Sequence, residues 1–71
     1  MSKVLLKKFA EKLKKLREDK GLTQEDLACD ASISRSTISM VEINKRDITL
    51  AKLEKIADAL GVKPYELLKF D

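Results

Sequence analysis

Three short stretches of this sequence repeat one pattern: an apolar residue, then serine or threonine, then a second apolar residue four positions after the hydroxyl. They are LTQEDL at 22–27, ISRSTI at 33–38 and ITLAKL at 48–53. Such a hydroxyl accepts a hydrogen bond from an exposed amide in the first turn of a helix, and the two apolar side chains pack together across the helix start. The pattern therefore predicts three helices that begin at defined residues and are joined by short connections.

Two further segments complete the expected fold. From Val4 to Lys20 the apolar residues recur every three or four positions, as in an amphipathic helix, and Gly21 follows as a terminator. Pro64 opens a short last helix that extends to Lys69. We expect a single all-α domain of five helices, residues 1–71. The apolar stripes that should form its core are Leu6, Phe9, Leu13 and Leu16 in the first helix and Leu50, Leu53, Ile56, Ala57 and Leu60 in the fourth.

Charge is distributed unevenly along the chain. The net charge is +3 with an isoelectric point near 9.1, yet residues 1–20 alone contain eight basic and three acidic residues. This asymmetry is compatible with a nucleic acid partner, although lysines on an amphipathic helix also serve simply to solvate it. No apolar run approaches the ~20 residues that a membrane span requires, and Cys29 has no second cysteine to pair with. We expect a cytoplasmic protein that does not enter the membrane.

The chain offers little chemistry for catalysis. Histidine is absent, the single cysteine has no partner base, and no cluster of cysteine and histidine has the spacing of a zinc site. The two glycines, Gly21 and Gly61, cannot form a phosphate-cradling loop. We therefore expect a protein that is not an enzyme and that uses no metal, cofactor or small-molecule ligand.

The second and third helices, about residues 24–31 and 35–43, are separated by only three or four residues. A connection this short makes the second helix cross the first at a steep angle, which is the geometry of a helix-turn-helix. The small residue Ala28 allows the two helices to approach closely. The same spacing also suits an ordinary structural pair of helices, so spacing alone leaves open whether the unit binds DNA.

The exposed face of the expected third helix is unusual for a protein surface. Ile38 and Val41 mark its buried side. The helical period then turns Ser36, Ser39 and Met40 outward, flanked by Arg35 and Thr37. Serine and threonine are mediocre helix formers, so this face costs helix stability. Because short side chains let a helix approach the base edges in the major groove, we interpret the face as a surface that reads DNA.

Residues 12–68 resemble the lambda-repressor-like family of helix-turn-helix DNA-binding domains, also described as Cro-type or XRE-like. The likeness rests on LREDKGLTQEDLA, followed by ISRSTISMVE and, after a short loop, LEKIADALGV. The segment RDIT further resembles the loop of the small controller proteins of restriction-modification systems. Three positions depart from the family pattern, in which glycine is common at Ser32 and Asn44 and proline at Ile48. Ser32 is the costlier of the first two, because asparagine tolerates left-handed backbone better.

The resemblance implies roles for individual residues. Arg17 and Glu42 match an ion pair that ties the first helix to the recognition helix. The residues implied to face the bases are Arg35, Ser36, Thr37, Ser39 and Met40. Those implied to contact DNA phosphates are Thr23, Gln24, Ser34, Lys45 and Arg46, of which Ser34 also caps the recognition helix.

We expect a sequence-specific, double-stranded DNA-binding transcriptional regulator, either a repressor or an activator that touches RNA polymerase. The chain is small and offers few base contacts, so a homodimer on a pseudo-palindromic operator would supply the missing specificity. Tyr65, Leu68 and Phe70 are the expected dimer interface. The alternative is a protein-interaction or antitoxin-like module that keeps the fold without reading bases, with Met40 and Ile43 as its apolar patch.

Overall fold

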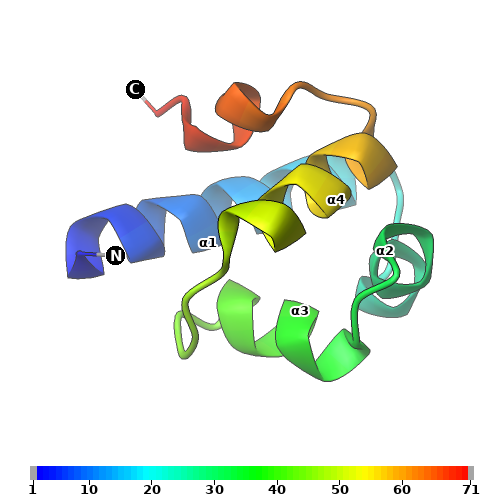
Figure 1. Ribbon diagram of the computed structural model, residues 1–71, viewed down its shortest axis with the longest axis horizontal. Coiled ribbons are helices and arrows are strands. Elements are labelled where there is room, and N and C mark those ends of the chain that lie inside the picture. The colour runs from blue at the N-terminus through cyan, green and yellow to red at the C-terminus, as the bar shows by residue number, and fades with distance from the viewer. Residues whose placement is uncertain (1, 71) are drawn as a thin grey trace.

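Four α-helices and a final 3₁₀ helix make up the computed structural model, which describes residues 2–70. They are α1 (Lys3–Asp19), α2 (Gln24–Ala31), α3 (Arg35–Glu42), α4 (Leu50–Leu60) and the 3₁₀ helix η1 (Pro64–Leu68). This part of the chain has no strand and no helix that is long and apolar enough to cross a membrane. In Figure 1, α1 runs along the molecule, with α3 on one side of it and η1 on the other.

The predicted helix starts are capped by the expected hydroxyls. Thr23 Oγ1 accepts from Asp26 N–H at 3.0 Å between the heavy atoms, Ser34 Oγ accepts from Thr37 N–H at 3.1 Å, and Thr49 Oγ1 accepts from Lys52 N–H at 3.2 Å. α1 begins one residue earlier than predicted, because Ser2 caps it by accepting from Leu5 N–H at 3.1 Å. Local sequence thus determines where each α-helix begins.

Left-handed residues turn the chain between helices. Gly21, with φ 72°, does so after α1, as predicted, and Gly61, with φ 71°, does so after α4. The turn after α2 instead uses Ser32, with φ 55°, and the turn after α3 uses Asn44, with φ 64°. Both occupy positions where the family commonly has glycine, so this chain keeps the left-handed turns without it. Both residues carry a Cβ atom that makes this conformation costly, but the side chain of asparagine can hydrogen-bond locally, so the cost is greater for Ser32.

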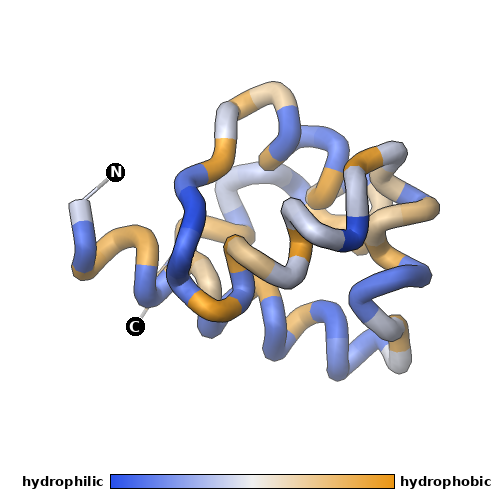
Figure 2. The backbone as a smooth tube through the Cα atoms, turned by 90° about the horizontal axis from the view of Figure 1, so that it is seen from below, coloured by the Kyte–Doolittle hydropathy of each residue, from blue (hydrophilic) through white to orange (hydrophobic). Residues whose placement is uncertain are grey.

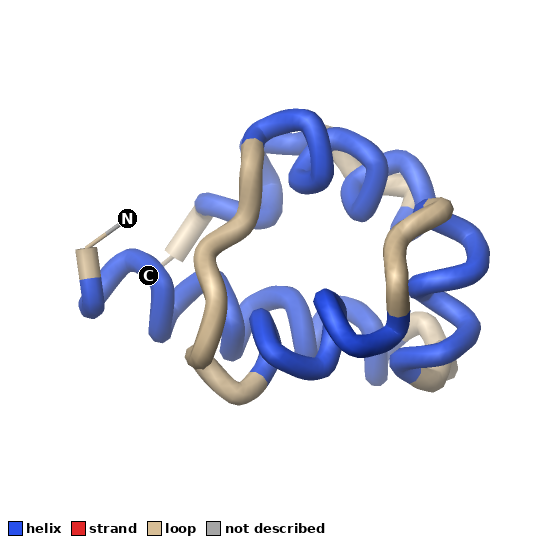
Figure 3. Tube along the Cα trace, turned by 60° about the horizontal axis from the view of Figure 1, so that its bottom comes forward, coloured by secondary structure: helices blue, strands red, loops and turns tan. Residues whose placement is uncertain are grey.

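The turn between α2 and α3 is short and hydrogen-bonded. Ser32 N–H donates to the carbonyl of Cys29 at 3.2 Å, and Ile33 N–H donates to the carbonyl of Ala28 at 2.9 Å. Ser34 then caps α3, so the chain changes direction within three residues. Figure 3 shows this short connection at one end of α3 and the longer loop 43–49 at the other. The helix-turn-helix geometry predicted from the spacing is present.

One side of α3 faces the core. α2 packs against both α3 and α4, α1 packs against α3, and η1 lies against α1 and α4. Ile38 and Val41 of α3 are fully buried in the resulting core. The other large side chains that are fully buried are Phe9, Leu13, Leu27, Ile56 and Leu67. Because neighbouring helices cover only this side of α3, its opposite side is at the surface.

The last helical segment differs from the prediction. The chain forms a 3₁₀ helix of five residues instead of an α-helix to Lys69, so the fold has four α-helices rather than five. Pro64 has no amide hydrogen, and Glu66 N–H bonds to the carbonyl of Lys63, three residues earlier. Five residues form too few bonds to sustain an α-helix in isolation. Packing holds the segment instead, because Leu67 is fully buried.

The predicted core stripe of α4 is correct except at its first residue. Leu53, Ile56 and Leu60 are buried, whereas Leu50 is 79% exposed. Leu50 shares the stripe with Leu53, but it is the first residue of α4, and no helix extends far enough to cover it. The helical period alone could not reveal this, because it gives the direction of a side chain and not the reach of neighbouring helices.

α3 also ends one residue earlier than predicted, at Glu42.

Replacing Ser32 with glycine should stabilise the domain by about 0.5–1 kcal/mol. Glycine avoids the Cβ penalty of left-handed backbone, and its greater loss of conformational entropy on folding offsets part of that gain. Urea unfolding followed by circular dichroism measures the difference. The same change at Ser36, an exposed serine within α3, is the control and should destabilise by about 0.5 kcal/mol. A Ser32→Gly variant no more stable than the parent protein would contradict this account of the turn.

Candidate nucleic-acid interface

The outer side of α3 presents four of the five residues predicted to face DNA bases. Arg35 and Ser36 are exposed, and Ser39 and Met40 are half-buried. Figure 2 views the molecule from the side of α3 and shows this helix in front, beside the hydrophilic loop that follows it. α3 is therefore a surface helix whose outer face places two serines between the longer side chains of Arg35 and Met40, so its backbone can come close to a DNA groove at the serines.

Thr37 does not share this face. It is 6% exposed, its hydroxyl lies 2.8 Å from that of Ser34, and its N–H donates to Ser34 Oγ at 3.1 Å. The prediction that Thr37 is turned outward is therefore wrong. Thr37 stands four residues before Val41, which places both on the buried side of the helix. The four-residue spacing between Thr37 and Val41 indicates burial, but threonine is polar and was therefore expected at the surface.

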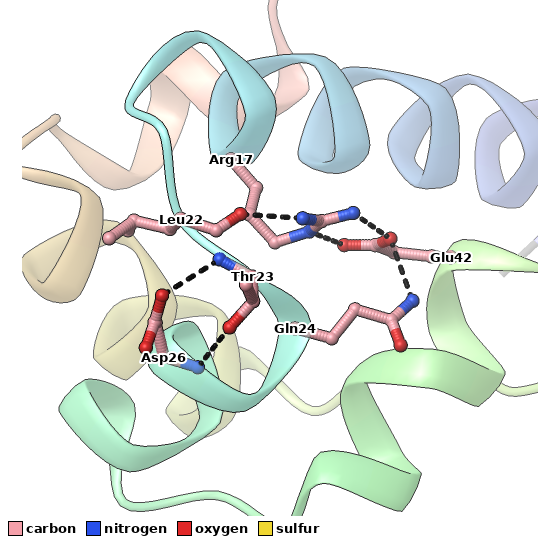
Figure 4. Close-up of polar contacts among 6 residues, drawn as sticks. All are labelled: Arg17, Leu22, Thr23, Gln24, Asp26 and Glu42. Atoms are coloured by element: carbon pink, nitrogen blue, oxygen red, sulfur yellow. Dashed lines mark hydrogen bonds and ion pairs between the residues drawn. The ribbon is translucent and has the colours of Figure 1, made fainter.

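Three helices meet in a network around Glu42, the last residue of α3 (Figure 4). Arg17 of α1 donates two hydrogen bonds to its carboxylate, from Nε to Oε2 at 2.7 Å and from Nη2 to Oε1 at 3.0 Å. Arg17 Nη1 also donates to the carbonyl of Leu22 at 2.6 Å. Gln24 of α2 donates from Nε2 to Glu42 Oε1 at 3.1 Å. The predicted ion pair is present, and the network extends it to α2.

The network is largely removed from solvent. The side chain of Arg17 is 10% exposed and that of Glu42 is 2% exposed. The hydrogen bond to Glu42 raises the pKa of Arg17 above its ordinary value. A buried pair is by itself weak evidence of stability, but loss of one partner would leave an uncompensated charge. The pair therefore acts mainly to hold α3 in one position relative to α1.

Gln24 has a role that the sequence did not reveal. It was predicted to contact phosphate, and the structure places its amide nitrogen on Glu42, eighteen residues away in sequence. No local spacing connects the two residues, so only the fold brings them together. Glu42 takes one of the two amide hydrogens of Gln24, which leaves the second for an outside acceptor. A phosphate contact from Gln24 would thus be coupled to the position of α3.

The start of α2 is organised by Thr23 and Asp26. Thr23 N–H donates to Asp26 Oδ2 at 3.0 Å, and Asp26 N–H donates to Thr23 Oγ1 at 3.0 Å. The backbone hydrogen bond from Thr23, with its hydroxyl as a second cause, lowers the pKa of Asp26 below its ordinary value. The amide of Thr23 is thus occupied. Its hydroxyl also contacts Asp26, so the first amides of the helix are the groups that remain for a phosphate.

The remaining residues predicted to contact DNA or a second protomer lie in two places, the loop after α3 and the end of the chain. Lys45 and Arg46 are exposed in the loop that follows α3. Of the three residues predicted to form a dimer interface, Tyr65 is 63% exposed and Leu68 is 39% exposed. Phe70 is instead half-buried and packs against the hydrophobic core. The structure therefore leaves Tyr65 and Leu68 more available to a partner than Phe70.

Comparison with known proteins shows which family has this arrangement of helices. The profile of the helix-turn-helix family HTH_3 matches residues 13–67, from the middle of α1 into η1. The chain belongs to the helix-turn-helix family. The resemblance noted in the sequence is thereby confirmed over nearly its full extent.

Several relatives of this helix-turn-helix chain are controller proteins. Control protein C.BamHI of Bacillus amyloliquefaciens is 40% identical over 63 residues, which cover 87% of this chain and 78% of that protein. The restriction-modification controller C.AhdI from Aeromonas hydrophila superposes with a TM-score of 0.85 at 42% identity, covering 87% of this chain and 94% of that one. C.Esp1396I, solved on a 19-base-pair DNA duplex, gives 0.83 at 41% identity, covering 89% and 84%. The family and these relatives are DNA-binding regulators, not enzymes, and the chain is a sequence-specific DNA-binding regulator.

Replacing Glu42 with alanine should lower the free energy of unfolding by about 3 kcal/mol, because it leaves the Arg17 guanidinium buried without its partner. The double variant Arg17→Met, Glu42→Leu removes both charges and should recover most of that loss. Urea unfolding of the variants and the parent protein measures the differences. Glu54→Ala, at an exposed position of α4, is the control and should change stability by less than about 0.5 kcal/mol. Equal losses in the single and double variants would show that the ion pair is not the cause.

Proposed function

We propose that this helix-turn-helix chain binds a pseudo-palindromic operator as a homodimer, with α3 of each protomer in the major groove. The observation that carries the proposal is the outer face of α3, where Ser36 is exposed and Ser39 half-buried between longer neighbours. Such a face lets the helix backbone come close to the base edges. Two protomers related by a two-fold axis would place their recognition helices about 34 Å apart, one turn of DNA.

Each residue of this face has a distinct task in the proposal. Arg35, exposed in the first turn of α3, can donate two hydrogen bonds to guanine O6 and N7. The hydroxyls of Ser36 and Ser39 can each donate or accept at a base edge. Met40, half-buried, can lie against the methyl group of thymine. Thr37 has no base contact in this proposal, because it supports α3 from its buried side.

Phosphate contacts would position α3 from both of its ends. Lys45 and Arg46 follow its C-terminal end, and Ser34 caps its start. Thr23 and Gln24 stand at the start of α2, where Gln24 bonds to Glu42 at the C-terminal end of α3. Contacts of this kind fix the register of a protein on DNA without reading sequence. The hydroxyl of Ser34 already bonds to Thr37, so its contribution would be smaller than those of the cations.

An apolar patch supports the homodimer. Leu50 is 79% exposed, and Leu5 and Leu68, at 36% and 39% exposed, lie around the same cavity of about 120 Å³. The patch joins the start of α4 to α1 and η1, and it includes Leu68 from the predicted interface. Exposed leucines that cluster across three elements are costly unless a partner covers them. We assign Leu5, Leu50 and Leu68 to the centre of the interface, Tyr65 to its edge, and a lesser part to Phe70.

The likeness to restriction-modification controllers supports a role at a promoter. A dimer that covers a promoter would repress it, and one bound beside a promoter could activate it by touching RNA polymerase. Both actions would take place in the cytoplasm, where the operator is. The competing function is a protein-interaction module, and the feature that favours it is Ile43, which is 56% exposed next to Met40.

Substitutions at Arg35 and Lys45 should separate base reading from phosphate binding. After an operator is selected from a randomised duplex library, Arg35→Ala should weaken operator binding by about 1–3 kcal/mol and relax preference at one base position in each half-site. Lys45→Ala should weaken operator and random duplex by the same factor and reduce the salt dependence. Fluorescence anisotropy at several salt concentrations measures both effects.

Two results would count against these roles. A library that yields no enriched motif would favour the protein-interaction module, and partners of Met40 and Ile43 should then be sought. Equal losses on operator and random duplex for both variants would show that Arg35 does not read a base.

Replacing Leu50 with glutamine should weaken the homodimer about tenfold or more. A symmetric interface loses the burial of two leucine side chains, and each fully buried leucine contributes about 1.5–3 kcal/mol. The fold should be unaffected, because Leu50 is already exposed in the single chain. Analytical ultracentrifugation over a micromolar range gives the dissociation constant, with Ile43→Gln as a control at another exposed apolar residue. If Leu50→Gln changes the dissociation constant of the homodimer no more than Ile43→Gln does, the interface lies elsewhere.

A further inference from the structure

A cleft between the start of α1 and the loop after α3 gathers basic side chains from two distant parts of the chain. Its volume is about 440 Å³, and its lining residues are Lys3, Leu6, Asn44, Lys45, Arg46 and Asp47. Three cations and one carboxylate therefore line it, and the net positive charge suits an anion. Lys3 is the one cation of this set that was not named from the sequence as a DNA contact.

The cleft lies on the same side of the molecule as the outer face of α3. Figures 2 and 3 show the loop 43–48 continuing from the end of α3 on the side nearest the viewer, with the start of α1 beyond it. A duplex held against α3 would bring its backbone past this loop. We propose that Lys3 completes, with Lys45 and Arg46, a binding site for a phosphate of the DNA backbone. This inference rests on the proposed DNA binding by α3.

The fold places Lys3 at this site through two local features. Ser2 caps α1, so Lys3 is the first residue of the helix, one turn before the half-buried Leu6. At the other wall, the left-handed residue Asn44 turns the chain, and Lys45 N–H donates to the carbonyl of Met40 at 2.9 Å. These features fix the backbone on both sides of the cleft. The lysine side chains are free to adjust, as a contact with a phosphate requires.

The other lysines of α1 provide a contrast. Lys8, Lys12 and Lys15 line a different cleft, together with Lys69 and Phe70 from the end of the chain. That end lies along α1 on the side away from α3 (Figure 1). A duplex bound to α3 would therefore not reach these lysines. The basic charge of α1 is thus divided, and Lys3 belongs to the part that faces the DNA.

The test compares Lys3→Gln with Lys8→Gln, which removes the same charge from an exposed position on the other side of the same helix. Binding to the selected operator and to a random duplex is measured by fluorescence anisotropy between low and moderate salt. Lys3→Gln should weaken both duplexes severalfold by the same factor. It should also reduce the slope of log affinity against log salt by about one for each protomer. Lys8→Gln should leave the affinity and the slope nearly unchanged.

A second measurement locates the phosphate. Operator duplexes that each carry one neutral methylphosphonate reveal which phosphates the parent protein needs. The phosphate whose replacement weakens operator binding by the parent protein, but not by Lys3→Gln, is the one that Lys3 contacts. Replacement of that phosphate or its neighbour should likewise leave operator binding by Lys45→Gln unchanged. If no methylphosphonate position distinguishes Lys3→Gln from the parent protein, the site is overturned.

Failure of this site and failure of the proposed function give different results. If the parent protein selects a motif with steep salt dependence, but Lys3→Gln behaves like Lys8→Gln, the Lys3 site alone is overturned. A larger loss on operator than on random duplex would also overturn it, because a phosphate contact is indifferent to sequence. A parent protein that selects no motif would overturn the proposed function and the Lys3 site together.

Discussion

The buried ion pair of Arg17 and Glu42 determines the orientation of α3 in the domain. α3 has only eight residues, too few for a stable helix in isolation, and its outer side receives no support from the fold. It is held by Ser34 at its start, by its buried side in the middle and by the pair at its end. Because Gln24 binds the same carboxylate, α1, α2 and α3 share a single fixed point. A short helix with a free face thereby obtains a defined orientation.

Helix stability and the proposed reading of DNA make opposite demands on α3. The short polar residues on its outer face favour close approach to a groove, but they are poor helix formers. The chain compensates beneath that face, where Thr37 is buried against the capping Ser34 and Ile38 is fully enclosed. The left-handed Ser32 has no such compensation of its own, so the core must offset its strain. The helix is therefore stable only as part of the domain.

Local signals were sufficient for most of the fold and for part of the site. The hydroxyl caps predicted the starts of α2, α3 and α4, because a cap depends on residues within four positions. Long-range geometry decided the rest: whether a helix covers Leu50, and whether Gln24 meets Glu42. Thr37 is an intermediate case, since its spacing from Val41 indicated burial while its polarity suggested exposure. The roles proposed for Arg35 and Lys45 rest on the family resemblance and on their exposed positions.

The short connections between helices also affect how quickly active protein becomes available. Packed helices such as α2 and α3 are neighbours in the chain, and only three residues separate them. Folds dominated by such local contacts form in microseconds to milliseconds, because little loop entropy is lost before contacts form. Synthesis of a 71-residue chain takes far longer, on the order of several seconds. The amount of folded regulator would then follow its translation without a lag, so delays in a circuit that it controls must arise from steps after folding, such as its accumulation.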